Sequence, residues 1–308
     1  MSYYIISQTK GENMTEKPLT LYEAARKMGV IFEEEATPLE KDVEVNGIKL
    51  SYLDWGNEDK QTMLLLHGRT NSAHTWDFTS LAFHASYHVI ALNQRGHGDS
   101  DWHKDGDYSL NTNIPDIEAF VKKLGLNNII LVGHSMGARN SMVFASRNPD
   151  LVSKLVLVDM APETVRDELD TIRGWRRLPE RADTFDEFID AALAINPRRT
   201  REQLKGSLSH QLRLYPDGKW SWKWDQALRT ADTNGWGPKI LWEHVEKIIT
   251  PTLLVLGSES HLISPEIANK MGSKIKDFKW EYVEGAGHQV PGDRPAGFQE
   301  IVRNFLNQ

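Results

Sequence analysis

The sequence predicts an α/β fold, a doubly wound and mostly parallel sheet of eight strands with an inserted helical cap. Short, almost wholly apolar runs recur along the chain, as in strands that are buried on both faces. Helical patterns separate these runs, and strands connected through helices form parallel sheets. The series is interrupted between residues 163 and 237, where the apolar runs vanish and helical patterns dominate. We therefore expect a sheet built from both ends of the chain around one insertion.

Residues 1–40 are expected to form an N-terminal extension ahead of this sheet. Thr20 and Glu23 have the spacing of a capping box, and Gly29 follows as a helix stop. These signals predict a short helix over residues 21–28. The sequence leaves its role open between packing on the domain and contacting another subunit.

The core domain is expected to comprise residues 41–162 and 238–308. It begins with a hairpin around a tight Asn46-Gly47 turn. The predicted strands are residues 43–45, 48–53, 63–66, 89–92, 128–132, 155–158, 252–256 and 278–283. The predicted helices are residues 114–124, 138–148 and 295–306.

Residues 163–237 are expected to form a cap over the carboxyl edge of the sheet, where ligands bind in open α/β folds. Trp220, Trp222 and Trp224 alternate, which places three indoles on one face of an extended segment. They are candidate substrate-binding residues, but such residues more often hold a small cap together, and we favour that interpretation. The cap is also rich in arginines, among them Arg198 and Arg199. A solvated helical face is the default interpretation, and attraction of a carboxylate-bearing substrate is the alternative.

The composition limits the classes of partner. The chain has 308 residues, a formal net charge of −7 and no long basic run, which disfavours nucleic acid and anionic membrane surfaces. It has no cysteine, so disulfides, thiolate nucleophiles and cysteine metal sites are excluded. No run reaches the ~18 apolar residues of a membrane span, and residues 1–8 do not have the pattern of a secretory signal. We therefore expect a cytoplasmic protein, monomeric or homodimeric, with a small-molecule substrate.

The Gly-His-Ser-Met-Gly sequence at residues 133–137 is the motif around which the chain is organised. It lies between a predicted strand and a predicted helix, which is the context of a nucleophile elbow. The serine of an elbow stands at the apex of a sharp turn. The residues two before and two after it crowd against strand and helix, which requires glycine at both. Ser135 is therefore the candidate nucleophile, and an ordinary strand-to-helix turn is the alternative.

Four motifs together resemble those of one superfamily. They are His67-Gly68, the Arg-Gly-His-Gly-Asp-Ser sequence at 95–100, the elbow, and the Gly-Ala-Gly-His sequence at 285–288. In this order they resemble the α/β-hydrolases over about residues 42–308. The single insertion after the sixth strand is similar to the lidded esterase, haloperoxidase and dehalogenase-like branch. The resemblance implies the α/β-hydrolase fold and does not fix a substrate.

The resemblance also implies a base and an oxyanion hole. A serine hydroxyl needs a base to take its proton, and His288, in the glycine-rich loop after the last strand, is the natural one. The backbone N–H groups of Met136 and Arg69 are the expected oxyanion donors. The Arg69 side chain is expected to contact an anionic substrate group or to form a salt bridge with an acid such as Asp99. The other histidines are expected to fix loops or to have surface or local partners, among them His67, His74, His97, His134 and His210.

The acid of the expected triad is where the sequence departs from the family. The usual aspartate after the seventh strand would fall at Ser260 or His261, and neither is a carboxylate. Asp159 ends the sixth strand, and some lidded members of the fold take their acid from that place. Asp159 is therefore our preferred acid, and Glu259 or a pair without an acid are the alternatives.

The favoured function is a serine hydrolase that cleaves a carboxylic ester, thioester or lactone without a metal or organic cofactor. Perhydrolysis, cofactor-free haloperoxidase activity and C–C bond cleavage use the same apparatus and stay open. Epoxide hydrolase and haloalkane dehalogenase activities are disfavoured, because those enzymes use an aspartate nucleophile and this sequence has Ser135 in that position. The alternative from another class is a ligand receptor or scaffold with little turnover, which the absent strand-seven acid motivates.

Overall fold

The computed structural model describes residues 19–165, 173–230 and 237–308. Eight strands form one sheet in the order β1-β2-β4-β3-β5-β6-β10-β11. β1 pairs antiparallel with β2, and β2 pairs antiparallel with β4, whereas the remaining neighbours are parallel. The strands are β1 (Leu39–Val45), β2 (Ile48–Asp54), β3 (Thr62–Leu66), β4 (His88–Leu92), β5 (Ile129–His134), β6 (Val152–Val158), β10 (Thr252–Gly257) and β11 (Phe278–Val283). The predicted eight-stranded α/β sheet is confirmed.

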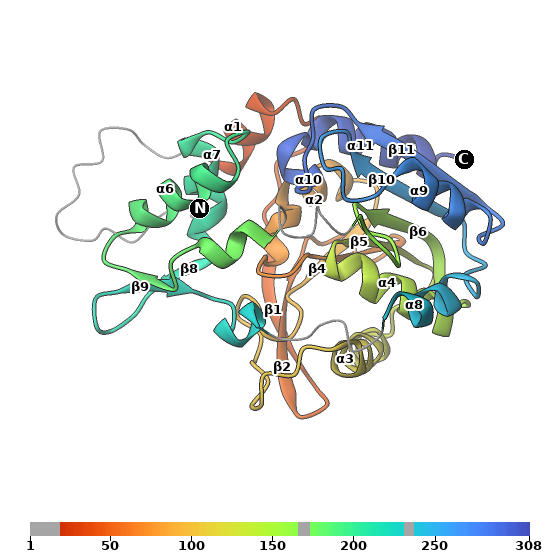
Figure 1. The fold of residues 1–308 in the computed structure, drawn as a ribbon, viewed down its shortest axis with the longest axis horizontal. Helices are drawn as coiled ribbons and strands as arrows, with labels where there is room; N and C mark the ends of the chain where they lie inside the picture. Colours follow the sequence, from red (N-terminus) through yellow and green to blue (C-terminus); the bar gives the residue numbers. More distant parts are fainter. Residues whose placement is uncertain (1–18, 166–172, 231–236) are drawn as a thin grey trace.

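Helices cover both faces of the sheet (Figure 1). One face packs against α3 (Leu110–Lys123), α4 (Met136–Arg147), α8 (Pro238–Val245) and α9 (Pro265–Gly272). The other packs against α1 (Leu21–Lys27), α2 (Asp77–Phe83), α10 (Val290–Asp293) and α11 (Pro295–Leu306). Alternate residues of β3 serve the two faces, since Leu64 and Leu66 lie in the first core, and Met63 and Leu65 lie in the second. This double burial explains the uninterrupted apolar runs in the sequence.

Most predicted elements appear close to their predicted bounds. Thr20 caps α1 in a complete capping box with Glu23. Asn46 and Gly47 join β1 to β2, and both have positive φ, as the predicted tight turn requires. Helix α3 begins at Leu110, about one turn before its predicted start. Among the described helices, none combines the length and the hydrophobicity that a membrane crossing requires.

The cap contains the helices that the sequence predicts and also a small sheet. It contains α6 (Phe185–Ile195), α7 (Arg201–Ser209) and the 3₁₀ helices η3 (Arg173–Arg177) and η4 (Gln226–Arg229). It also contains a small antiparallel sheet of β7 (Arg181–Ala182), β9 (Trp220–Trp222) and β8 (Leu212–Leu214). β9 coincides with the extended segment predicted around Trp220 and Trp222. β7 and β8 were not predicted, because strands of two or three residues are too short to show a periodic pattern.

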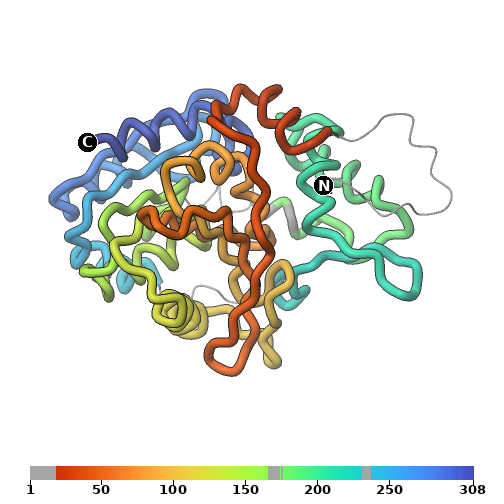
Figure 2. Tube along the Cα trace, turned by 180° about the vertical axis from the view of Figure 1, so that it is seen from behind, coloured from red at the N-terminus to blue at the C-terminus, as the bar shows by residue number. Residues whose placement is uncertain are grey.

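Helix α1 lies between the core and the cap, and Figure 2 shows it running beside the cap. On one side of α1, Leu21 and Ala25 are buried against the core. On its other side, Lys27 Nζ lies 3.4 Å from a carboxylate oxygen of Glu202 in α7, and Met28 Sδ accepts a hydrogen bond from the amide of Gln203. Of the two roles left open for the N-terminal helix, the structure shows packing on the domain.

Candidate active site

The candidate site is built at the turn between β5 and α4. Ser135 has φ 53° and ψ −112°, a conformation that costs a non-glycine residue on the order of 1–3 kcal/mol. The turn leaves no room for a side chain at the positions two residues before and two residues after the serine. A Cβ at Gly133 would collide with the carbonyl oxygen of Gly137, and one at Gly137 would collide with that of Leu66. The two glycines of the motif are therefore required by space.

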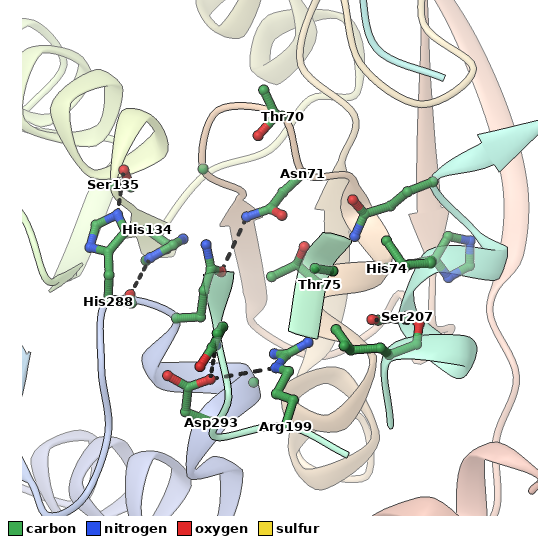
Figure 3. A pocket seen from close by; sticks show the side chains of 18 of the residues that line it. Thr70, Asn71, His74, Thr75, His134, Ser135, Arg199, Ser207, His288 and Asp293 are labelled. Atoms are coloured by element: carbon green, nitrogen blue, oxygen red, sulfur yellow. Dashed lines mark hydrogen bonds and ion pairs between the residues drawn. The ribbon is translucent and has the colours of Figure 1, made fainter. Parts of the chain in front are cut away.

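The structure brings Ser135, His288 and Asp159 together, although they come from three separate loops. The Ser135 hydroxyl lies 3.0 Å from His288 Nε2, and His288 Nδ1 lies 2.7 Å from Asp159 Oδ2. Figure 3 shows the first of these contacts as a dashed line at the edge of the pocket. Because a carboxylate can only accept, His288 Nδ1 carries the proton and Nε2 faces the serine as an acceptor.

Asp159 is fixed by the loop that follows β10. Its side chain is 1% exposed. The Gly257 N–H donates to Oδ1 at 3.2 Å, and the Ser260 hydroxyl donates to Oδ2. Ser260 occupies a position where the usual acid was expected, and here it holds the acid that comes from the end of β6. No pattern in the sequence predicts this hydrogen bond between Ser260 and Asp159.

Glu259, the alternative acid, points elsewhere. Its carboxylate lies 2.6 Å from Arg198 Nε, and its side chain is 49% exposed. The ion pair directs it toward the cap rather than toward His288. Among the acids considered from the sequence, the one in contact with His288 is Asp159.

The predicted oxyanion donors belong to two backbone segments that meet at Ser135. Met136 is the first residue of α4, where backbone N–H groups have no partner within the helix. Residue 68, which precedes Arg69, lies so close to the elbow that a Cβ there would come within 3.2 Å of Ser135 Cβ. The next turn is fixed by the Thr70 N–H, which donates to His97 Nε2 at 3.1 Å. Both donors are thus carried by constrained backbone beside Ser135.

Three buried histidines surround this arrangement without entering it. His67 donates to the Gly68 carbonyl at 2.7 Å, and His97 donates to the Arg95 carbonyl at 2.9 Å, so both make the loop-fixing bonds predicted for them. His134 Nε2 lies 2.8 Å from the His288 carbonyl and supports the loop that carries His288. Burial lowers the pKa of His97 to about 4 and that of His134 to about 3, and lowers the pKa of His67 well below its usual range. All three are therefore neutral near pH 7.

A cavity of about 1190 Å³ opens between the core and the cap and includes Ser135 and His288 in its wall. Trp222 and Trp224 also line it, although they are only 2% and 1% exposed. Their rings stack 5.3 Å apart, and Trp222 packs edge-on against Phe188 at 5.0 Å. Trp220 instead packs against Phe185 and is not among the lining residues. The tryptophans thus form the core of the cap, and two of them also form cavity wall.

The positively charged residues considered from the sequence have specific partners. Arg198 pairs with Glu259, and Arg199 Nε lies 3.4 Å from the buried Asp293. The guanidinium of Arg69 lies 3.4 Å from the Leu228 carbonyl. The salt bridge considered between Arg69 and Asp99 is wrong, because Asp99 is paired with two cap residues, Arg213 and Lys223.

Residues of the N-terminal extension also line the cavity, which no sequence pattern indicates. They are Leu19, Leu21, Ala24, Lys27 and Met28. The capping box predicts the helix but not the surface on which it packs.

Comparison with known proteins settles the family. A model of the alpha/beta hydrolase fold matches residues 61–295. This chain belongs to the α/β-hydrolase family. Its relatives include esterase Rv0045c of Mycobacterium tuberculosis, which is 29% identical over 88% of this chain and 90% of the relative. A crystal structure of that esterase superposes with a TM-score of 0.78 over 94% of this chain and 96% of the other.

Two further relatives are named as enzymes that catalyse hydrolysis. The 2-(acetamidomethylene)succinate hydrolase of Mesorhizobium japonicum is 27% identical over 87% of this chain and 95% of its own length. A crystal structure of E-2-(acetamidomethylene)succinate hydrolase, 25% identical in sequence, superposes with a TM-score of 0.79 over 88% of this chain and 100% of the other. The N-formylmaleamate deformylase of Pseudomonas putida is 27% identical over 86% of this chain and 96% of its own length. With the family, these relatives identify the chain as a hydrolase.

Proposed function

We propose that the protein is a serine hydrolase that cleaves a carboxylic ester, thioester or lactone through an acyl-enzyme intermediate. The observation that carries the proposal is the series of hydrogen bonds from Ser135 through His288 to Asp159, at 3.0 and 2.7 Å. Nucleophile, base and orienting acid in this order are the arrangement that activates a serine. The relative named as an esterase supports the ester as the substrate class.

The chemistry begins with the Ser135 hydroxyl. Its oxygen bonds to the carbonyl carbon of the ester while its proton passes to His288 Nε2. The carbonyl oxygen becomes an oxyanion, which the N–H groups of Met136 and Arg69 stabilise. When the C–O bond to the alcohol breaks, His288 returns the proton to the leaving oxygen.

Water completes the cycle. His288 takes a proton from a water molecule as the water oxygen bonds to the acyl carbon, and the second tetrahedral species forms at the same donors. The bond to Ser135 then breaks, and His288 gives the proton back to the serine oxygen. The products are a carboxylic acid and the alcohol released earlier. Every proton is accounted for by His288 and water.

Asp159 has the task of orienting His288. Its carboxylate accepts from Nδ1 and so keeps the tautomer in which Nε2 is the base. It also stabilises the imidazolium that forms during each transfer. The hydrogen bonds from Gly257 and Ser260 hold the buried carboxylate in place.

Labelling with a fluorophosphonate probe tests this proposal. We expect a covalent adduct on Ser135 that is absent from the Ser135→Ala variant, and hydrolysis of p-nitrophenyl esters that is lost in the same variant. A chain-length series of these esters then defines the acyl group that the cavity accepts. An inert Ser135 in a protein that still binds ligands would instead support the receptor alternative.

A further inference from the structure

A second cluster of chemically active side chains lies where the cap meets the core. His74 is in the short helix η1 (Ala73–Trp76), Asp77 is the first residue of α2, and His210 directly follows α7 of the cap. One potential ligand atom of each lies within 4.8 Å of the others. The imidazoles of His74 and His210 stack with centroids 3.8 Å apart, and His74 Nδ1 lies 3.0 Å from an Asp77 carboxylate oxygen.

These three side chains make a donor set suited to a metal ion. Two imidazole nitrogens and one carboxylate oxygen are ligands that zinc and its neighbouring divalent transition metals accept, with a fourth position left for water. The side chains of His74 and Asp77 are 12% and 11% exposed, so the donors are largely shielded from solvent. His74 and Asp77 are three residues apart in one continuous helical segment, which places both on the same face.

We propose that His74, Asp77 and His210 bind Zn²⁺ or a similar divalent transition-metal ion between the core and the cap. On binding, the ion takes the place of the proton between His74 Nδ1 and Asp77, which is released to solvent, because metal ligands must be deprotonated. The two imidazoles turn out of their stack so that one nitrogen lone pair of each, which lies in the plane of its ring, points to the ion. The sequence predicts no metal site, because His74 and His210 are far apart along the chain. Only the packing of the cap on the core brings them together.

The ion has a structural consequence that is separate from the chemistry of Ser135. His74 and Asp77 belong to the core, whereas His210 belongs to the cap, so a shared ion ties the two together. All three residues line the cavity. Figure 3 shows His74 on the side of the pocket opposite Ser135 and His288. Metal binding therefore fixes one wall of the cavity without contacting the reacting groups.

Calorimetric titration of the full-length protein with zinc chloride tests the site. We expect one ion per chain in the wild type and an affinity at least about tenfold lower in His210→Ala and in Asp77→Asn. His261→Ala is the matched control, because His261 also lines the cavity but lies outside the cluster. His288→Ala tests the histidine that contacts Ser135 and also lines the cavity. Both of these variants are expected to bind zinc as the wild type does.

A second measurement tests whether the ion joins cap and core. Zinc is expected to raise the melting temperature of the wild type relative to protein in EDTA, because a ligand that binds only the folded state stabilises it. The rise should be lost in His210→Ala, whose melting in EDTA reports whether it folds. If His210→Ala does not fold, Asp77→Asn serves the same comparison.

Wild-type zinc affinity in folded His210→Ala and Asp77→Asn would overturn the proposal. So would loss of binding in His288→Ala alone, which would place the ion on the Ser135 site. Neither readout depends on ester hydrolysis, so the outcome is independent of the proposed function.

Discussion

The two parts of the molecule that enclose the cavity are held in different ways. On the core side, Ser135 stands on a turn in which neither Gly133 nor Gly137 has room for a methyl group. On the cap side, a three-stranded sheet of very short strands is held by a cluster of aromatic side chains around Trp222. The difference teaches that the positions of the reacting atoms are determined by backbone sterics, whereas the shape of the pocket depends on side-chain packing.

The contacts that join the two parts reinforce this contrast. Arg198–Glu259 and Lys27–Glu202 connect exposed side chains, and such pairs contribute about 0–1 kcal/mol. Arg199–Asp293 is more buried, with the Asp293 side chain 2% exposed. Among these three pairs, the buried one is therefore expected to attach the cap to the core most strongly.

The largest effect is expected on the core side. Asp159→Asn should lower kcat/KM by at least about a hundredfold, because losing the orienting carboxylate of a serine triad costs on the order of 10⁴ in rate. Ester hydrolysis by the folded variant measures it. Glu259→Gln is the control, and its kcat/KM is expected to stay within a few fold of the wild type. Equal kinetics in Asp159→Asn and wild type would remove Asp159 from the mechanism.

His261→Asp sharpens the same point. It creates a carboxylate at a position where the family usually carries its acid. Because Asp159 already contacts His288, we expect no increase in the rate of ester hydrolysis. A large increase would show that the native acid is inadequate.

The next effect belongs to the cap. Trp222→Ala removes a buried indole that packs on Phe188 and Trp224 and donates to the Pro179 carbonyl at 2.7 Å. The expected cost is about 3–5 kcal/mol of cap stability. Hydrogen exchange should show faster exchange in α6 and α7 and unchanged protection in the central strands. Trp220→Ala, at a less buried position, should have a smaller effect. Equal loss of protection in the core would mean that the two parts unfold as one.

The pH dependence of stability is the third test and concerns the core. His97 and His134 have pKa values lowered to about 4 and about 3 by burial, so the folded state stays neutral where the unfolded chain, with a pKa near 6.5, takes up protons. The free energy of unfolding should therefore fall as the pH falls from about 6.5 toward 4, by up to about 1.4 kcal/mol per pH unit for each histidine. Denaturant titrations at several pH values measure this slope. His97→Asn should reduce this slope by the contribution of one histidine, up to about 1.4 kcal/mol per pH unit. An unchanged slope would contradict the lowered pKa of His97.

The smallest effect is expected where α1 meets the cap. Lys27→Ala removes an ion pair whose side chains are 59% and 50% exposed, so stability should change by no more than about 0.5 kcal/mol. Arg199→Ala is the contrasting variant and should cost more, because it leaves the buried Asp293 without its arginine. Thermal unfolding compares the two. Equal costs would show that burial does not distinguish these contacts.

The sequence predicted the core well because its signals are local. The apolar runs, the Asn46-Gly47 turn and the elbow each follow from a few adjacent residues. The contact between Ser260 and Asp159 was not predictable in this way, because it depends on how two loops from different strands meet. The same holds for the small cap sheet, for the α1 residues that line the cavity, and for the approach of His210 to His74.

Helix α1 has a consequence for how such an enzyme can change over evolutionary time. Its residues form part of the cavity wall, yet it lies in the sequence before the sheet and far from every residue of the Ser135 site. Substitutions in this helix are therefore expected to change what the cavity binds without disturbing the hydrogen bonds of Ser135, His288 and Asp159. One part of the cavity wall and the contacts of Ser135 thus come from separate segments of the chain, so a substitution in α1 can change the wall and leave those contacts intact.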